Sequence, residues 1–178
     1  MKKIIFIILC ISVYKIEAQS YGSSLGVNAG YAEDGIGIMA EYNYYVSRFN
    51  SVHISGYMSF ANYKYEDIDV PYALYSLQVG YTQNIWRNHF RRNIKISGLG
   101  GVQVGYESIN NGKESLWTGD IVTSESKIIY GAYLGAEIDL LLGDDFSFII
   151  RANENFHINS DVGNLTMFAG IGIRYYIY

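Results

Sequence analysis

The sequence has little of three things that most exported globular domains contain: proline, cysteine and charge. Its 178 residues include one proline, one cysteine and 17% charged residues, while 49% are hydrophobic. This composition excludes a disordered chain, because disorder requires low hydrophobicity and a surplus of charge. A single cysteine excludes an intramolecular disulfide. The formal net charge of −4 argues against direct nucleic-acid binding, which requires a clustered basic surface to neutralise phosphates.

Tyrosine and glycine are the residues that the sequence has in excess. It contains 18 Tyr and 19 Gly, against 8 Phe and 2 Trp. Each tyrosine carries a hydroxyl group that needs water or a hydrogen-bond partner, so a fold that places many rings at an apolar–polar boundary would account for the excess. The length is that of one domain.

The first 18 residues predict a secretory signal peptide. A start with two lysines precedes an apolar run at residues 4–13, and Ala18 is a small residue at the expected cleavage point. The run is too short to cross about 30 Å of hydrocarbon. Cys10 lies inside the run, but the residue before it is not small, which disfavours lipidation at this cysteine. We therefore expect cleavage after residue 18 and an exported mature chain, residues 19–178, without cysteine.

Two-residue alternation of apolar and polar side chains runs through most of the mature chain. No stretch has the i, i+3, i+4, i+7 apolar spacing of an amphipathic helix over three turns, whereas a period of two is typical of a strand with two different faces. Gly98, Gly100 and Gly101 interrupt one segment and predict a bend or bulge there. The eight predicted strands lie within residues 24–31, 36–46, 52–60, 75–82, 94–107, 128–140, 146–157 and 165–177.

The polar face of these strands decides between two architectures. In a soluble sandwich or lipocalin-like barrel the apolar face forms the core, whereas in a membrane barrel it contacts lipid. The polar face here is mostly Gly, Ser, Asn, Gln and Thr, which suit a narrow interior, and its acids and bases nearly balance. We therefore predict an all-β fold, an eight-stranded antiparallel up-and-down transmembrane β-barrel. Its candidate lumen charge network consists of Glu41, Lys95, Glu107, Glu137, Asp139, Arg151 and Arg174.

Glu154 is the one charged residue that the alternation places clearly on the apolar face. The expected connections also suit a membrane barrel, because the most loop-like ones, at 64–72, 107–127 and 158–164, share one end, as in outer-membrane barrels with periplasmic termini. Residues 172–178 resemble the C-terminal signal for barrel insertion. Several tyrosines are predicted to face outward near strand ends and to anchor at the membrane interfaces: Tyr31, Tyr42, Tyr44, Tyr81, Tyr106, Tyr130 and Tyr175.

The mature chain offers few residues for catalysis or metal binding. It has no cysteine nucleophile, no G-x-S-x-G motif and no phosphate-binding loop. His53 and His157 fall on the predicted inner face, where they either join a hydrogen-bond network or pair with serines in a lipid-modifying enzyme. The acids at residues 66–69 are either solvated or bind calcium weakly. We expect a protein that is not an enzyme and has no metal and no cofactor.

Side chains rather than a channel are expected inside the barrel, because an eight-stranded interior is just wide enough for them. Those predicted to fill it are Tyr45, Tyr57, Tyr133, Arg151 and Arg174. The 107–127 connection carries Trp117 and the apolar pair 121–122, which either pack on the barrel or contact a partner. A basic turn facing the periplasm either anchors at anionic headgroups or docks a periplasmic protein. This basic turn comprises Trp86, Arg87, His89, Phe90, Arg91 and Arg92.

Several short segments spread over the chain carry a family resemblance. The most extensive is Gly105-Tyr-Glu-Ser-Ile-Asn-Asn-Gly112, and the others are 69–71 leading into 79–81, 91–93, 129–131 and 170–174. These segments resemble the TraO family of conjugal transfer proteins from Bacteroidetes conjugative transposons. The resemblance covers the signal sequence and most of the mature chain. It implies membership of an envelope-spanning mating apparatus that passes DNA between cells, and it implies no catalytic residue.

These observations predict a non-enzymatic component of a conjugal DNA transfer apparatus, located in the bacterial outer membrane. Its expected partners are outer-membrane lipid and other envelope proteins of that apparatus, without direct nucleic-acid binding. Two alternatives are a lipid-modifying outer-membrane barrel enzyme and a soluble periplasmic ligand-binding barrel with its apolar face inward.

Overall fold

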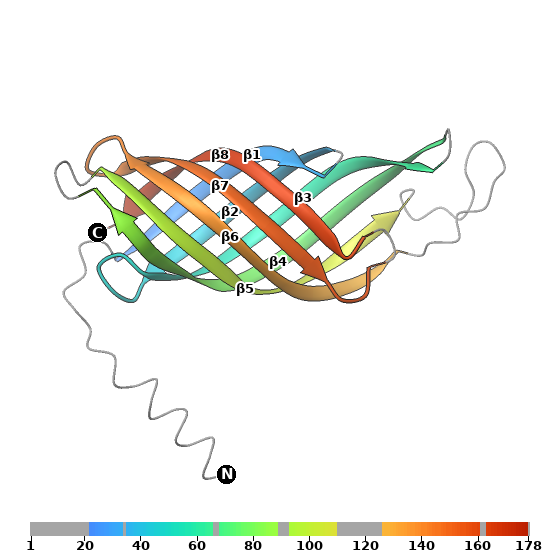
Figure 1. Ribbon diagram of the computed structural model, residues 1–178, viewed down its shortest axis with the longest axis horizontal. Helices are drawn as coiled ribbons and strands as arrows, with labels where there is room; N and C mark the ends of the chain where they lie inside the picture. The colour runs from blue at the N-terminus through green and yellow to red at the C-terminus, as the bar shows by residue number, and fades with distance from the viewer. Residues whose placement is uncertain are drawn as a thin grey trace, which may run out of the picture.

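The computed structural model is a closed barrel of eight antiparallel strands in which each strand pairs with its neighbours in sequence and β8 pairs with β1 (Figure 1). This confirms the predicted fold. The structure describes residues 22–33, 35–65, 68–88, 93–109, 126–160 and 163–177, so the predicted signal peptide lies outside the described residues. The strands are β1 (Ser23–Ala32), β2 (Gly35–Tyr45), β3 (Ser51–Tyr65), β4 (Ile68–Arg87), β5 (Ile94–Ile109), β6 (Lys127–Leu141), β7 (Phe146–His157) and β8 (Leu165–Ile177).

The two faces of the barrel wall follow the alternation in the sequence. Apolar side chains point out of the barrel, as at Leu134, which is 72% exposed, whereas polar ones such as Asn28 and Ser147 are fully buried inside. An eight-stranded barrel with this inside-out pattern is suited to lipid. The soluble ligand-binding alternative requires the apolar face to point inward, and the structure contradicts it. Among the described residues, no helix is both long enough and apolar enough to span a bilayer.

Aromatic side chains surround the outside of the barrel near both ends. All seven tyrosines predicted to face outward do so, with exposures between 41% and 53%. Tyr42, Tyr44 and Tyr175 lie near the end that carries the termini, and Tyr31, Tyr106 and Tyr130 lie toward the opposite end. Two aromatic belts separated by apolar residues are typical of a barrel whose rings sit at both membrane interfaces.

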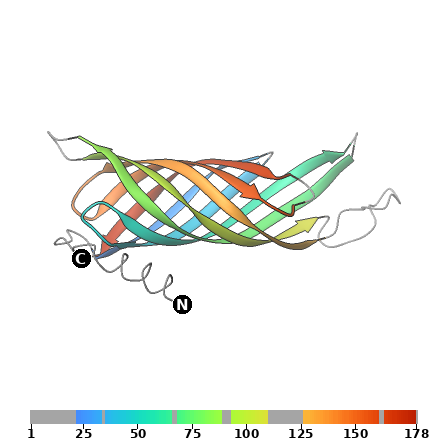
Figure 2. The same ribbon diagram turned by 60° about the horizontal axis from the view of Figure 1, so that its bottom comes forward.

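The β3–β4 connection is shorter than predicted. We expected a loop at residues 64–72, but β3 continues to Tyr65 and β4 begins at Ile68, with Asn62 opposite Pro71 in the same ladder. The resulting hairpin projects past the rim at the end opposite the termini (Figures 1 and 2). The alternation did not reveal these strand residues because a ribbon that has left the membrane does not need one apolar face.

The predicted bulge lies in a different strand. Pairing of β5 with β6 runs without interruption through Gly98, Gly100 and Gly101, whereas the β4–β5 register shifts between Asn84 and Trp86. The extra residue is Ile85, and it reverses the direction of the side chains that follow it, so Trp86 lies exposed on the outer face. Gly101 lies instead where β4 approaches closely, because a side chain there would collide with the Val79 carbonyl oxygen.

Candidate functional site

The centre of the lumen holds two arginines and two glutamates in a closed ring of ion pairs. Arg151 lies 2.6 Å from Glu41 and 2.5 Å from Glu137, and Arg174 lies 2.6 Å and 2.7 Å from the same two carboxylates. All four side chains are at most 4% exposed. Each charge therefore has two opposite charges as neighbours, which offsets the cost of removing it from water.

Asp139 extends the ring of ion pairs toward the end of the barrel that carries the termini. Arg174 lies 3.1 Å and Lys95 lies 3.0 Å from its carboxylate, and the Tyr176 hydroxyl donates to the same group at 2.5 Å. The ammonium of Lys95 also donates to the Tyr176 oxygen at 2.8 Å. We call Glu41, Lys95, Glu137, Asp139, Arg151 and Arg174 the charge cluster. Its three acids and three bases carry no net charge.

Strand register explains why the charge cluster forms. Arg151 is the cross-strand partner of Glu137, and Lys95 is the partner of Asp139. Directly opposed residues on one face of an antiparallel pair lie close enough to interact. Glu41 reaches Arg174 across β1 because Gly26 lies between them, and a side chain at Gly26 would collide with the Glu41 carboxylate.

Glu107 is buried in the lumen but away from the charge cluster. It lies near the outer end of β5, meaning the end of the barrel opposite the termini. Lys95 is twelve residues away along that strand, which is about 40 Å at a rise of about 3.3 Å per residue. There the Ser160 hydroxyl donates to its carboxylate at 2.7 Å. The structure thus brings together six of the seven charges in the predicted network.

Amide, hydroxyl and imidazole groups occupy the interior beside the charge cluster. Gln78 donates to Gln103 at 3.0 Å and to Asn155 at 3.1 Å. His53 forms hydrogen bonds with Tyr133 at 2.5 Å and Thr82 at 3.0 Å. His157 forms hydrogen bonds with Thr166 at 3.0 Å and, more weakly, with Gln103 at 3.4 Å. These contacts are those of a hydrogen-bond network.

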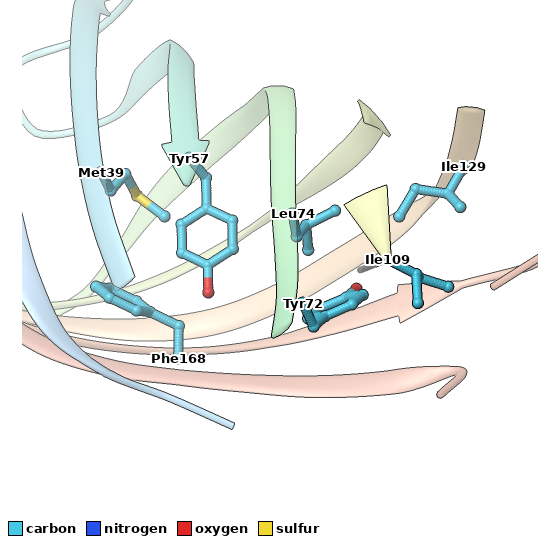
Figure 3. Close-up of a cluster of buried hydrophobic side chains, with 7 residues drawn as sticks. All are labelled: Met39, Tyr57, Tyr72, Leu74, Ile109, Ile129 and Phe168. Carbon is cyan, nitrogen blue, oxygen red and sulfur yellow. The ribbon is translucent and has the colours of Figure 1, made fainter. Parts of the chain in front are cut away.

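An apolar layer lies inside the barrel toward the outer end (Figure 3). Tyr57 and Phe168 meet edge to face with ring centroids 5.4 Å apart, and Phe168 is fully buried. Gly37 allows this packing, because a side chain there would collide with both rings. The layer completes the filling of the lumen, in which the predicted residues Tyr45, Tyr57 and Tyr133 are also buried. Its members are Met39, Tyr57, Tyr72, Leu74, Ile109, Ile129 and Phe168.

Sequence reasoning did not find this layer or the role of Tyr176. Period-two alternation places Tyr176 on the same face as Arg174, so that signal was present. The apolar layer has no such signal, because Met39, Leu74 and Phe168 interrupt the polar pattern of three separate strands. Only barrel closure brings them together.

Part of the basic turn is described at the end of the barrel that carries the termini. The Arg87 guanidinium lies 4.1 Å from the centre of the Phe49 ring, and Arg48 approaches that ring at 5.3 Å. Trp86 is 48% exposed. Phe49 belongs to the β2–β3 turn, so two connections at this end of the barrel share one cationic and aromatic surface. His89, Phe90, Arg91 and Arg92 lie outside the described residues.

The other predicted candidates are only partly described. Within the described ranges, no group of three or more His, Cys, Asp or Glu side chains is placed to hold a metal ion. Glu66 and Asp67 of the acidic segment lie outside the described residues. So do Trp117 and the apolar pair 121–122 of the long connection.

The fold is that of small outer-membrane barrels. Neisserial surface protein A from Neisseria has a TM-score of 0.58 and 12% identity over 86% of this chain and 94% of that one. A major outer membrane protein from Thermus thermophilus has a TM-score of 0.61 and 10% identity, covering 89% and 100%. OprG, an outer membrane protein of Pseudomonas aeruginosa, has a TM-score of 0.61 and 9% identity, covering 92% and 100%. At these identities the likeness shows the fold alone.

The chain belongs to the TraO family. The family model, described as conjugative transposon protein TraO, matches residues 18–177. This confirms the resemblance found in the sequence. No curated protein matches the sequence significantly.

Proposed function

We propose that this protein is a non-enzymatic outer-membrane component of a conjugal DNA transfer apparatus, exported by a cleaved signal peptide. Family membership over residues 18–177 is the observation that carries the proposal. The apolar outer wall with its two aromatic belts supports a location in a membrane, and the basic start and apolar run of the first 18 residues support export.

The packed lumen argues for a scaffold rather than a conduit. Charged, amide and apolar side chains fill the barrel from end to end, and Phe168 and Ile149 are fully buried within it. Neither a DNA strand nor an unfolded protein fits where such side chains are in contact. We therefore place the working contacts of the protein on its outer wall and on the basic turn, which would face the periplasmic part of the apparatus.

The hydrogen bonds of the histidines disfavour the lipid-modifying alternative. A serine hydrolase needs a serine hydroxyl within hydrogen-bond reach of a histidine. His53 and His157 are each 1% exposed and bond to tyrosine, threonine and glutamine side chains.

The proposed role is tested by deleting the gene and measuring the transfer frequency of the element that encodes it. We expect a fall of at least a hundredfold, restored by the wild-type gene supplied in trans. Unchanged transfer would refute the role. Membrane fractionation tests the location independently, since release of the protein without detergent would contradict it.

The basic turn is tested by reversing charge at Arg87, Arg91 and Arg92 together. We expect at least tenfold lower transfer with unchanged abundance of folded barrel, because a docking surface for the apparatus would be lost. Substitution by lysine keeps the positive charge and serves as the matched control. Equal transfer by the reversed and the lysine variants would refute docking of the apparatus through the positive charge of this turn.

A further inference from the structure

Glu154 points outward from the barrel and lies on its apolar outer face. It is exposed on β7 between Phe146 and Phe156, two aromatic residues on the same outward face. Phe156 is two residues nearer the outer end, which corresponds to about 5 Å of depth at about 3.3 Å per residue and a tilt near 45°. Glu154 therefore lies within the hydrocarbon region, inside the outer aromatic belt.

The Glu154 carboxylate has no partner within the part of the chain that the structure describes. Its cross-strand neighbours are the apolar residues Leu134 and Met167. A carboxylate that faces lipid without a counter-charge is unfavourable, and ionisable residues at this depth usually mark sites of function. A positive charge supplied by another molecule would therefore stabilise the Glu154 carboxylate.

Small side chains make up much of the surface diagonal to Glu154, although Leu134 and Met167 lie directly beside it. Alanine occupies the position two residues before it in β7 and three of the four diagonal positions on β6 and β8. Small side chains on a membrane-facing surface let another backbone approach closely. We call this surface the alanine patch: Ala132, Ala136, Ala152 and Ala169, with Glu154 at its centre.

A second copy of this chain does not supply the missing charge. A two-fold symmetric contact through the alanine patch would bring two Glu154 side chains together. A head-to-tail contact would need a base on the outer wall, but Lys95, Arg151 and Arg174 all point into the lumen, and no other base lies on the outer wall between the aromatic belts of the described strands.

We propose that the alanine patch binds a membrane-spanning segment of a different protein, which carries a lysine or arginine at the depth of Glu154. The inference rests on the proposed membrane location and adds a partner class that the proposed function does not specify. The ion pair would form in surroundings of low dielectric constant, so it would decide which partner binds and in which register.

Site-specific photo-crosslinking in cells that carry the conjugative element tests the proposal. A photo-reactive residue replaces Leu134, the exposed neighbour of Glu154, or Met58 on the opposite wall as control. We expect an adduct to another integral membrane protein from position 134 only. The cross-linked segment should be apolar with one internal lysine or arginine.

Substitutions at Glu154 then test the charge. E154Q should reduce the adduct at least tenfold and E154D should retain most of it, while both variants keep the electrophoretic mobility of the folded barrel. E154K combined with glutamate at the partner's base should restore the adduct. An adduct only to lipid or lipopolysaccharide, one to a second copy of this chain, or one unchanged by E154Q would overturn the proposal. The proposed function would stand in each case if gene deletion still abolished transfer.

Discussion

Glu137 and Glu154 lie on strands that pair with each other, yet their side chains have opposite surroundings. Glu137 points into the lumen, where Arg151 and Arg174 both contact its carboxylate. Glu154 points outward, opposite Leu134 and Met167. The face that a residue occupies in a strand therefore decides whether its charge is neutralised inside the protein or left for a partner.

The same contrast holds for the barrel as a whole. Six charges meet in the lumen and balance, whereas one charge faces outward within the apolar band of the described strands. The inner charges stabilise the barrel only as a set, because a buried charge that loses its partner keeps the cost of its removal from water. The outer charge does not stabilise the free barrel, because a charge on the lipid face is unfavourable. Four substitutions test this difference, in order of decreasing effect.

Arg174→Met should have the largest effect. It removes the base that contacts Glu41, Glu137 and Asp139 and leaves three buried carboxylates with two bases. We expect the free energy of unfolding to fall by about 3–5 kcal/mol, as for other broken buried ion pairs. Urea unfolding of the barrel in lipid vesicles measures this change. A loss below about 1 kcal/mol would show that the charge cluster is not a coupled set.

Phe168→Ala should have the next largest effect, because it opens a cavity beside Tyr57 in the apolar layer. We expect a loss of about 3 kcal/mol in the same unfolding assay. The control is Leu134→Ala on the outer wall, where lipid fills the space and the loss should stay below about 1 kcal/mol. Equal losses at the two positions would mean that the apolar layer is loosely packed.

Tyr176→Phe should have a smaller effect, because it removes one hydroxyl and no charge. That hydroxyl donates to Asp139 and accepts from Lys95. Hydrogen bonds to charged groups contribute about 1.5–3 kcal/mol, so we expect a loss near the lower value. The matched control is Tyr175→Phe, because Tyr175 is the preceding residue of the same strand and faces outward. This change should alter the unfolding free energy by less than about 0.5 kcal/mol.

Glu154→Gln should have the smallest effect and the opposite sign. Removing a charge from the lipid face of the purified barrel should raise the unfolding free energy by about 1 kcal/mol. A lysine or arginine on this face destabilises a membrane barrel by about 2–4 kcal/mol, and an acidic side chain destabilises it by less. Circular dichroism during urea titration suffices to detect it. Destabilisation by this change would mean that Glu154 has a partner within the barrel itself.

Much of this architecture was predictable because a barrel wall is a repeating local pattern. Alternation placed Arg151, Arg174 and Glu137 on one face and Glu154 on the other, and the structure agrees in each case. The β3–β4 hairpin and the bulge at Ile85 were not predictable in this way. One lies outside the membrane, where alternation is not required, and the other depends on how two strands match in length.

The sequence by itself determined the number of strands, the face on which most strand residues lie and the family. These properties follow from a period of two and from short motifs, both of which are local. Only the tertiary structure decided which inward side chains meet. The contact between Glu41 and Arg174, 133 positions apart, exists because β8 closes against β1 and brings β2 within reach. Closure also assembled the apolar layer, because the meeting of its side chains depends on register summed around the whole barrel.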